Sequence, residues 1–383
     1  MSKFAAFFMC LIELVYTFFS GGSANLSGRS EVLDAYKNMD EITATKYIGK
    51  VSDYVWNAND EFNINDTVTV KKEKGKDFVV LSISDVHFAD YEAKKVAESM
   101  HEISTIKHLV RTVKPDLILL LGDIVCKSST VHSIRRITDL FESFGVPWAP
   151  IFGNHDDEGN CDLNYLADVM MSGKHCLMQK GDPSMGVGNY IVNVAEDNGD
   201  GTEKIVESFI FMDSHKGTVY DNQIEWYRWA ANGINACTNG EAEISLVEHI
   251  PLPEYQYAID SLEVNSKTGV IKGDGAYGEV HEEIACHRTY PEREVVQHGV
   301  FDAVKATDTK YVFCGHDHLN NFSVMYDGVR LTYNTKCGNN SGMRFTQNGG
   351  TVIALDGEGI KSITQKSHVL SVWFNYYKVN TKK

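Results

Sequence analysis

Acidic, amide and imidazole side chains recur directly after short apolar runs of this sequence. Imidazole nitrogens together with Asp and Asn oxygens form a donor set that suits zinc, iron or manganese better than calcium or Cu(I). The pattern therefore predicts a transition-metal site. In chain order the motifs are Asp85-x-His87, Gly122-Asp123, Gly153-Asn154-His155, Val247-Glu248-His249 and Gly315-His316-Asp317-His318.

The number of donors predicts more than one metal ion. Seven donors exceed the four ligands of one tetrahedral zinc ion. Two residues separated by one position on an extended loop can face the same point, which makes Asp85 with His87 and His316 with His318 natural chelating pairs. If Asp123 bridges two ions, each ion has four protein ligands and keeps positions for water. The full set is Asp85, His87, Asp123, Asn154, His249, His316 and His318.

The first three motifs follow segments that we expect to be buried strands. Apolar runs at 78–85 and 117–123 and the run before Gly153 alternate with helical patterns at about 92–113 and 130–144. This alternation predicts a right-handed crossover series with a parallel sheet, whose ligand site lies beyond the carboxyl ends of the strands. Asp85, Asp123 and Asn154 stand at such ends.

Further strands and two long connections follow in the second half. Three apolar runs end in polar residues, and a helix over QIEWYRWAANG separates the first two; the runs are 207–214, 242–249 and 310–318. Asp327-Gly328 between alternating residues predicts a hairpin, and residues 349–363 predict another antiparallel pair. We interpret segments 156–206 and 251–299 as inserted loops that set substrate choice.

The ordered motifs resemble those of the calcineurin-like metallophosphoesterase superfamily over roughly residues 78–355, and the sequences around them resemble its single-domain, purple-acid-phosphatase-like branch. The resemblance implies an α/β fold, a four-layer α/β/β/α sandwich of two mixed β-sheets. It assigns Asp85, His87, Asp123 and His318 to one metal ion and Asp123, Asn154, His249 and His316 to a second. His155 is implied to be the catalytic acid and to bind no metal.

Two positions depart from the family pattern. Cys126 stands where purple acid phosphatases have a Tyr ligand, and His87 where they have Gly, so no tyrosinate-to-iron colour is expected. Protein phosphatases of the superfamily have an Asp at position 126 that orients the catalytic His. Here Asp156, another carboxylate or a backbone carbonyl is left for that role.

The resemblance implies a metal-dependent hydrolase of phosphate esters, with phosphomonoesters as the preferred class and a bridging hydroxide as the nucleophile. Two iron, zinc or manganese ions would be the cofactors, and a phosphorylated small molecule or protein the substrate. One alternative is a phosphodiesterase acting on nucleotides or lipid headgroups. Another is a non-catalytic, metal-organised binding protein, which predicts a broken donor set.

The net charge and the apolar N-terminal segment indicate which binding partners and which cellular location to expect for the protein. The formal charge of −16 argues against nucleic-acid binding, and no stable membrane span is expected. The apolar start suggests a cleaved signal peptide and a secreted or endolysosomal protein, with a retained anchor as the alternative. The expected segments are a signal at 1–24, an extension with an edge strand at 25–77, the catalytic domain at 78–365 and a tail at 366–383.

Asparagine triplets and cysteines give weaker indications of a secreted protein. Asn-x-Ser/Thr triplets begin at Asn25, Asn65, Asn321 and Asn339 and predict a glycoprotein. Removal of a signal would leave an odd number of cysteines, so at least one thiol is free or pairs between chains. Among them, Cys161 with Cys176 is the pair that we expect to form a disulfide.

Overall fold

The computed structural model describes residues 46–88, 93–126, 131–273, 275–285, 299–338, 342, 344, 347–369 and 372–382. The predicted signal segment, residues 1–24, lies outside the described residues and stays a prediction. Within the described part of the chain, no helix has the length and apolar character needed to cross a bilayer.

Six strands form the first sheet. One half consists of the parallel strands β2, β3 and β4, and the antiparallel strands β14, β15 and β16 are added beside β2. The parallel strands carry almost only buried apolar side chains, as expected for strands covered on both faces. In spatial order the strands are β16 (Val372–Asn380), β15 (Gly359–Val369), β14 (Gly349–Asp356), β2 (Phe78–Ile83), β3 (Leu117–Leu121) and β4 (Trp148–Ile151).

Eight strands form the second sheet, which is also mixed. Strands β6, β7, β11 and β13 run parallel to one another. On one side β5 is antiparallel to β6 and parallel to β1, and on the other β12 and β10 are antiparallel additions. In spatial order they are β1 (Val68–Lys72), β5 (Tyr190–Asp197), β6 (Glu203–Phe211), β7 (Glu243–Val247), β11 (Tyr311–Cys314), β13 (Val329–Tyr333), β12 (Asn321–Tyr326) and β10 (Tyr277–Glu279). Short elements outside this sheet are β8 (Glu263–Val264), β9 (Ile271–Lys272), η1 (Ile64–Asp66) and η2 (Pro183–Met185).

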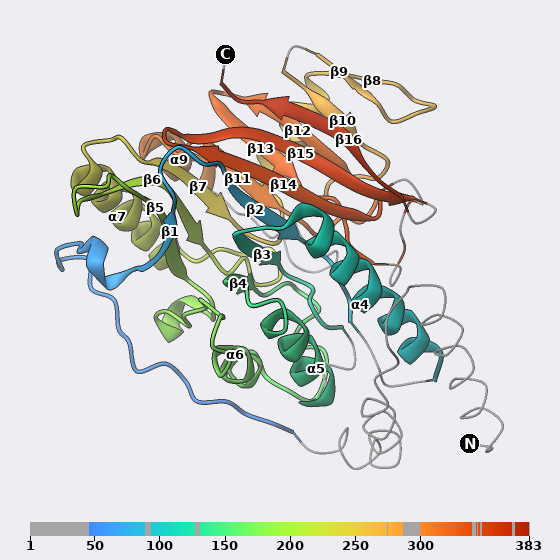
Figure 1. Ribbon diagram of the computed structural model, residues 1–383, viewed down its shortest axis with the longest axis horizontal. Coiled ribbons are helices and arrows are strands. Elements are labelled where there is room, and N and C mark those ends of the chain that lie inside the picture. Colours follow the sequence, from blue (N-terminus) through green and yellow to red (C-terminus); the bar gives the residue numbers. More distant parts are fainter. Residues whose placement is uncertain are drawn as a thin grey trace.

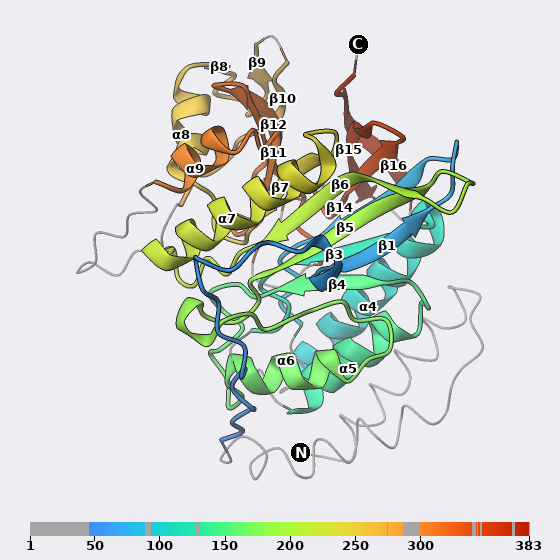
Figure 2. The same ribbon diagram turned by 90° about the vertical axis from the view of Figure 1, so that its left-hand side faces the viewer.

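Helices cover the outer face of each sheet (Figures 1 and 2). The six-stranded sheet is covered by α4 (Ala93–Val113), α5 (Val131–Glu142) and α6 (Leu163–Met171). The eight-stranded sheet is covered by α7 (Asp221–Thr238), α8 (Pro253–Asp260) and α9 (Val300–Ala306). Because the two sheets pack face to face between these helices, the predicted α/β/β/α sandwich of two mixed sheets is confirmed.

The hairpins and the edge strand that the sequence predicts are also present. Strands β12 and β13 pair through Asp327 and Gly328, both with the positive φ of a type I′ turn. Strands β14 and β15 form the second antiparallel pair. Strand β1, predicted from its alternating residues, lies at the edge of the eight-stranded sheet.

Three expectations are wrong. The segment 156–206 is no simple loop, since it contains α6 and β5, and the segment 251–299 contains α8, β8, β9 and β10. The supposed tail contributes β16 to the six-stranded sheet, where it pairs with β15. Turn residues around these short elements obscured their patterns in the sequence.

The expected disulfide is also absent. Cys161 and Cys176 are both free thiols. Each belongs instead to a short backbone bridge, Cys161 with Tyr47 and Cys176 with Trp148. The polar loop that both cysteines flank suggested a disulfide. The backbone bridges and the packing around them stabilise both segments without one.

The segment before β1 crosses the outside of the molecule as an extended strap, residues 46–63. Its Tyr47 amide donates to the Asn160 carbonyl at 2.8 Å, and the Gly49 amide donates to Asp162 Oδ1 at 3.0 Å. A Cβ at Gly49 would lie 2.1 Å from the backbone of Asn164, so only glycine permits this close approach. The strap therefore fixes the start of α6.

Candidate metal centre

Each motif donor lies just past the carboxyl end of a strand. Asp85 follows β2 and Asp123 follows β3, while His249 follows β7 and His316 follows β11. Since the two sheets pack together, these ends converge at one place between them. The structure groups the ligand atoms of Asp85, His87, Asp123 and His318, and separately those of Asp123, His249 and His316, with all atoms of a group within 4.8 Å of one another.

The first group contains one imidazole pair and two carboxylates. The Nε2 atoms of His87 and His318 are 3.0 Å apart, and His87 Nε2 is 3.4 Å from Asp123 Oδ2. His318 Nε2 is 3.7 Å from Asp85 Oδ1. Three of the four side chains are buried and His318 is half-buried, so the group opens to solvent on the side of His318.

The second group shares Asp123 with the first. His249 Nε2 is 3.4 Å from Asp123 Oδ2 and 3.2 Å from Asn154 Oδ1. His249 Nδ1 lies 2.7 Å from the Leu121 carbonyl oxygen, to which only a protonated Nδ1 can donate. This contact directs Nδ1 to the Leu121 carbonyl and turns Nε2 toward Asp123 and Asn154, the ring orientation that metal binding needs.

The backbone at these donors is unusual. Asp85, Asp123 and His316 have φ values of 55°, 48° and 86°. Non-glycine residues adopt this left-handed region rarely, and such strain gathers at functional sites. The strain turns each donor sharply away from its strand toward the common centre.

The glycines of the motifs leave room for the donors. A Cβ on Gly122 would lie 2.5 Å from His249 Nδ1, and one on Gly153 would lie 2.3 Å from Asp123 Oδ1. A Cβ on Gly315 would approach the Ser84 hydroxyl, which donates to Asp85 Oδ2. Because these three glycines have no Cβ, the donors from the two sheets can approach one another.

Buried polar atoms at the centre show that the residues fit a cation. Asp123 Oδ2 and His316 Nδ1 are buried without a hydrogen-bond partner. Burial lowers the pKa of His316 to about 3, so this imidazole is neutral and keeps a lone pair. Burial also works against charge on His249, yet Asp123 raises its pKa to about 10. A bound cation can replace that proton beside Asp123.

His155 lies beside the donors without joining either group. Its backbone amide donates to Asp123 Oδ1 at 2.8 Å, and its ring centroid is 5.4 Å from that of His87. Its Nδ1 atom lies 2.9 Å from Glu158 Oε1. The carboxylate that contacts the His155 ring is therefore Glu158, not Asp156.

Asp156 has a different role. Its carboxylate accepts hydrogen bonds from the amides of Gly153 and Val125 at 2.7 and 2.8 Å. Burial and the nearby Asp123 raise its pKa well above the usual range. Asp156 thus fastens the loop that carries Asn154 to the loop that follows β3.

Two residues beside the donor groups, Lys336 and Glu158, were not predicted from the sequence. The buried Lys336 ammonium donates to the Asp85 carbonyl, and burial lowers its pKa. Glu158 stands three residues after His155 within a run of acidic residues, so only its spacing could have marked it. Neither residue follows a strand directly, which is why the strand-end pattern missed both.

Asp317, between the two histidines of the last motif, connects the centre to the second long segment. Its Oδ2 accepts from the Tyr333 hydroxyl at 2.5 Å and from the Ala285 amide at 3.0 Å. The Asn320 side-chain oxygen accepts from the His281 amide at 2.9 Å. Residues 281–285 are thereby held against the His316–His318 loop.

Other histidines and an arginine outside the motifs have structural partners or lie outside the described part. His215 Nε2 contacts Gln223 Oε1 at 3.1 Å, and His281 Nε2 contacts Glu279 at 2.7 Å. His287, Arg288 and His298 lie outside the described residues. Cys126 Sγ lies 3.8 Å from the His87 carbonyl oxygen and is not in either donor group.

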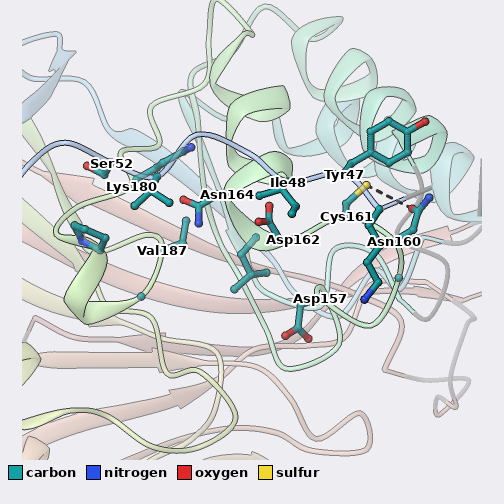
Figure 3. Close-up of a pocket in the computed structure, with 16 residues that line it drawn as sticks. Tyr47, Ile48, Ser52, Asp157, Asn160, Cys161, Asp162, Asn164, Lys180 and Val187 are labelled. Carbon is teal, nitrogen blue, oxygen red and sulfur yellow. Dashed lines mark hydrogen bonds between the residues drawn. The ribbon is translucent and has the colours of Figure 1, made fainter. Parts of the chain in front are cut away.

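A pocket of about 540 Å³ lies beside the segment that carries Glu158 (Figure 3). The strap forms one wall through Tyr47, Ile48 and Ser52, and the segment from Asp157 to Asn164 forms another. None of the seven donors lines this pocket. It is therefore separate from the metal centre, although Asp157, which lines it, stands between Asp156 and Glu158 in the chain.

Curated relatives of this chain include phosphatases and proteins named as inactive. The phosphatase DCR2 of Saccharomyces cerevisiae is 24% identical over 286 residues, which cover 67% of this chain and 46% of that protein. The probable inactive purple acid phosphatase 14 of Arabidopsis thaliana is 25% identical over 297 residues, covering 67% of this chain and 69% of that protein. The match thus spans less than half of the yeast protein.

Solved structures show a looser similarity. A dimetal phosphatase from Danio rerio aligns with a TM-score of 0.46 and 11% identity, covering 78% of this chain and 98% of that chain. The purple acid phosphatase PPD1 from yellow lupin also gives a TM-score of 0.46 and 11% identity, over 80% of this chain and 54% of that chain. Similarities of this size carry nothing about function.

The family model for calcineurin-like phosphoesterases matches residues 78–320. This range is more than half of the chain, and it contains all seven donors and His155. The chain belongs to the calcineurin-like phosphoesterase family.

Proposed function

We propose that this protein is a dinuclear metal-dependent phosphomonoesterase. The observation that carries the proposal is the sharing of Asp123 between two groups of donors at the meeting point of the two sheets. Asp85, His87, Asp123 and His318 would hold one divalent ion. Asp123, Asn154, His249 and His316 would hold the other.

Two divalent ions in such a site neutralise phosphoryl oxygens and make water a better nucleophile at neutral pH. The chain's own residues prepare the place for this chemistry. Burial keeps the His316 imidazole neutral. His249 and His87 keep the shared Asp123 carboxylate ionised against the effect of burial, and the covering sheets limit the access of bulk water. A net charge of −16 makes this local positive centre the main attraction for a phosphate dianion.

His155 would supply the proton in this proposal. The water first loses a proton to solvent. As the oxygen of the resulting hydroxide forms its bond to phosphorus, the bond from phosphorus to the leaving oxygen breaks and its electron pair stays on that oxygen. The proton on His155 Nε2 then passes to the leaving alkoxide. A positioned acid of this kind contributes about 10² to 10⁴ in rate.

Three Arabidopsis relatives are named as probable inactive purple acid phosphatases. Their names support the alternative of a non-catalytic protein. That alternative predicts missing or displaced donors. In this chain the grouped Asp and His donors converge, and Asn154 lies beside His249. The intact set favours catalysis.

Export remains a proposal, since residues 1–24 lie outside the described part. Of the four triplets, Asn65 is exposed and accessible to glycosylation, whereas Asn321 is buried and bonded to Thr335 and Gln347. Asn321 is therefore the wrong choice for a glycan in the folded protein. Asn25 and Asn339 lie outside the described residues.

The function is tested by comparing two substrates on one preparation loaded with Mn²⁺, Zn²⁺ or Fe²⁺. A phosphomonoesterase hydrolyses p-nitrophenyl phosphate much faster than bis-p-nitrophenyl phosphate. The opposite preference would support the phosphodiesterase alternative. No turnover of either ester by protein that holds two ions would support the non-catalytic alternative.

A further inference from the structure

Glu158 contacts the imidazole of His155 through Nδ1. Glu158 Oε1 lies 2.9 Å from His155 Nδ1, and the two side chains are only 16% and 22% exposed. A contact between partly buried groups at hydrogen-bond distance restricts ring rotation more than an exposed ion pair does. Because Nδ1 is engaged, Nε2 is the ring nitrogen left to meet a substrate.

The backbone around this pair fixes its geometry. The Glu158 amide donates to the His155 carbonyl at 3.3 Å, which closes a turn between the two residues. At the other end of the turn, the His155 amide is bound to Asp123 Oδ1. The pair is thus built into the same short segment that supplies Asn154.

The strap holds this segment from outside. Figure 3 shows Tyr47 and Ile48 of the strap beside Asn160, Cys161 and Asp162. The backbone of Tyr47 exchanges hydrogen bonds with Asn160 and Asp162 at 2.8 and 3.0 Å. These contacts begin two residues after Glu158, so the carboxylate stands on an anchored segment.

We propose that Glu158 is the positioning residue for His155, holding Nδ1 so that Nε2 points at the leaving oxygen of the substrate. This inference rests on the proposed phosphomonoesterase function. Glu158 belongs to neither group of metal donors, and it acts through His155. A carboxylate that orients an imidazole acid by its second nitrogen is a general catalytic arrangement.

The proposal makes a prediction about leaving groups. p-Nitrophenolate departs easily without a proton, whereas an alkoxide departs poorly unless it is protonated. Loss of the positioning contact should therefore slow hydrolysis of an alkyl phosphate far more than that of p-nitrophenyl phosphate. A residue with only a structural role would slow both esters equally.

The experiment compares Glu158→Gln, Glu158→Ala and His155→Ala with wild-type protein on glycerol phosphate and p-nitrophenyl phosphate. We expect Glu158→Gln to lower kcat on glycerol phosphate by about 10- to 100-fold, a part of what a positioned acid contributes, and on p-nitrophenyl phosphate by less than about 3-fold. Metal content and the thermal unfolding midpoint should stay at wild-type values. Equal losses on both esters, or loss of metal, would overturn the proposal.

Two controls sharpen the result. Asp157→Asn removes the same charge one residue away, where Asp157 pairs with Lys216 at 3.1 Å, and should leave both rates near wild type. Glu158→Gln added to His155→Ala should cause no further loss, because the contact it removes is already gone. A full additional loss in that double variant would overturn the positioning role.

Failure of the positioning role and failure of the proposed function give different results. If wild-type protein with two ions hydrolyses neither ester, the function is wrong and the inference falls with it. If wild-type protein is active but Glu158→Gln shows no selective loss on glycerol phosphate, only the inference is wrong.

Discussion

The Nε2 atoms of His87 and His318 lie 3.0 Å apart, although His87 follows a strand of one sheet and His318 a strand of the other. Two nitrogens bound to one tetrahedral ion at about 2.0–2.1 Å are roughly 3.3 Å apart. The pair is thus already close to the spacing of two ligands on one ion. A bound metal would join the two sheets at this point.

Metal removal should destabilise the fold. Chelation followed by dialysis is expected to lower the midpoint of thermal unfolding, because an ion present at about 100 times its dissociation constant stabilises the native state by about 2.7 kcal/mol. For a chain of this size the shift is on the order of 5 °C. Differential scanning fluorimetry of the chelated and reloaded protein measures it. An unchanged midpoint, with metal loss verified by elemental analysis, would contradict the joining role.

The close approach at Gly122 can be tested against a matched glycine. Gly122 and Gly145 both have positive φ, but a Cβ at Gly122 would meet His249 whereas one at Gly145 would meet nothing within 4 Å. Gly145→Ala should cost about 1 kcal/mol of stability from backbone strain and keep activity. Gly122→Ala should also lose bound metal and phosphatase activity. Equal metal content in the two variants would count against the contact with His249.

Asp317 should matter for stability as well as for loop placement. Asp317→Ala leaves both donors, the Tyr333 hydroxyl and the Ala285 amide, without their shared acceptor, and a buried polar group without a partner costs about 1–3 kcal/mol. Tyr333→Phe removes only one of these bonds and should cost less. Urea unfolding of both variants and of the double variant measures their coupling. Strictly additive losses would show that the two side chains act independently.

The buried Glu207, which is not one of the metal donors, should make the stability of the fold depend on pH. Burial, and next the neighbouring Glu243, raise the pKa of Glu207 well above its ordinary value of 4.5, while Lys382 opposes the shift only weakly. A carboxyl whose folded pKa is raised contributes stability below about pH 4.5, and that contribution is lost as pH rises toward the folded value. Glu207→Gln should therefore stabilise the protein at neutral pH and have little effect at pH 4. Chemical unfolding at both pH values checks the sign; stabilisation confined to acid pH would contradict it.

The layered fold and the convergence of the metal donors could be predicted from the sequence. Buried parallel strands appear as short apolar runs, and the donors stand directly after those runs. Asp85, Asp123 and His249 could be placed from their position after apolar runs. The Glu158 contact with His155 could not, since it depends on how residues 155–158 turn and on the strap that packs beside them. Strands β5 and β16 were missed because their pairing is set by partners distant in the chain.

The most direct test of the central claim is to count metal ions per chain and measure p-nitrophenyl phosphate turnover on the same sample, for wild type and for Asp123→Asn. We predict two ions per chain and turnover for the wild type. For Asp123→Asn, whose parent carboxylate serves both donor groups, we predict at most one ion and a rate lower by about 10²- to 10³-fold, the order of effect seen when one essential electrostatic group is removed. Full activity in protein that contains no metal, or two ions and normal turnover in Asp123→Asn, would contradict a dinuclear centre built on Asp123.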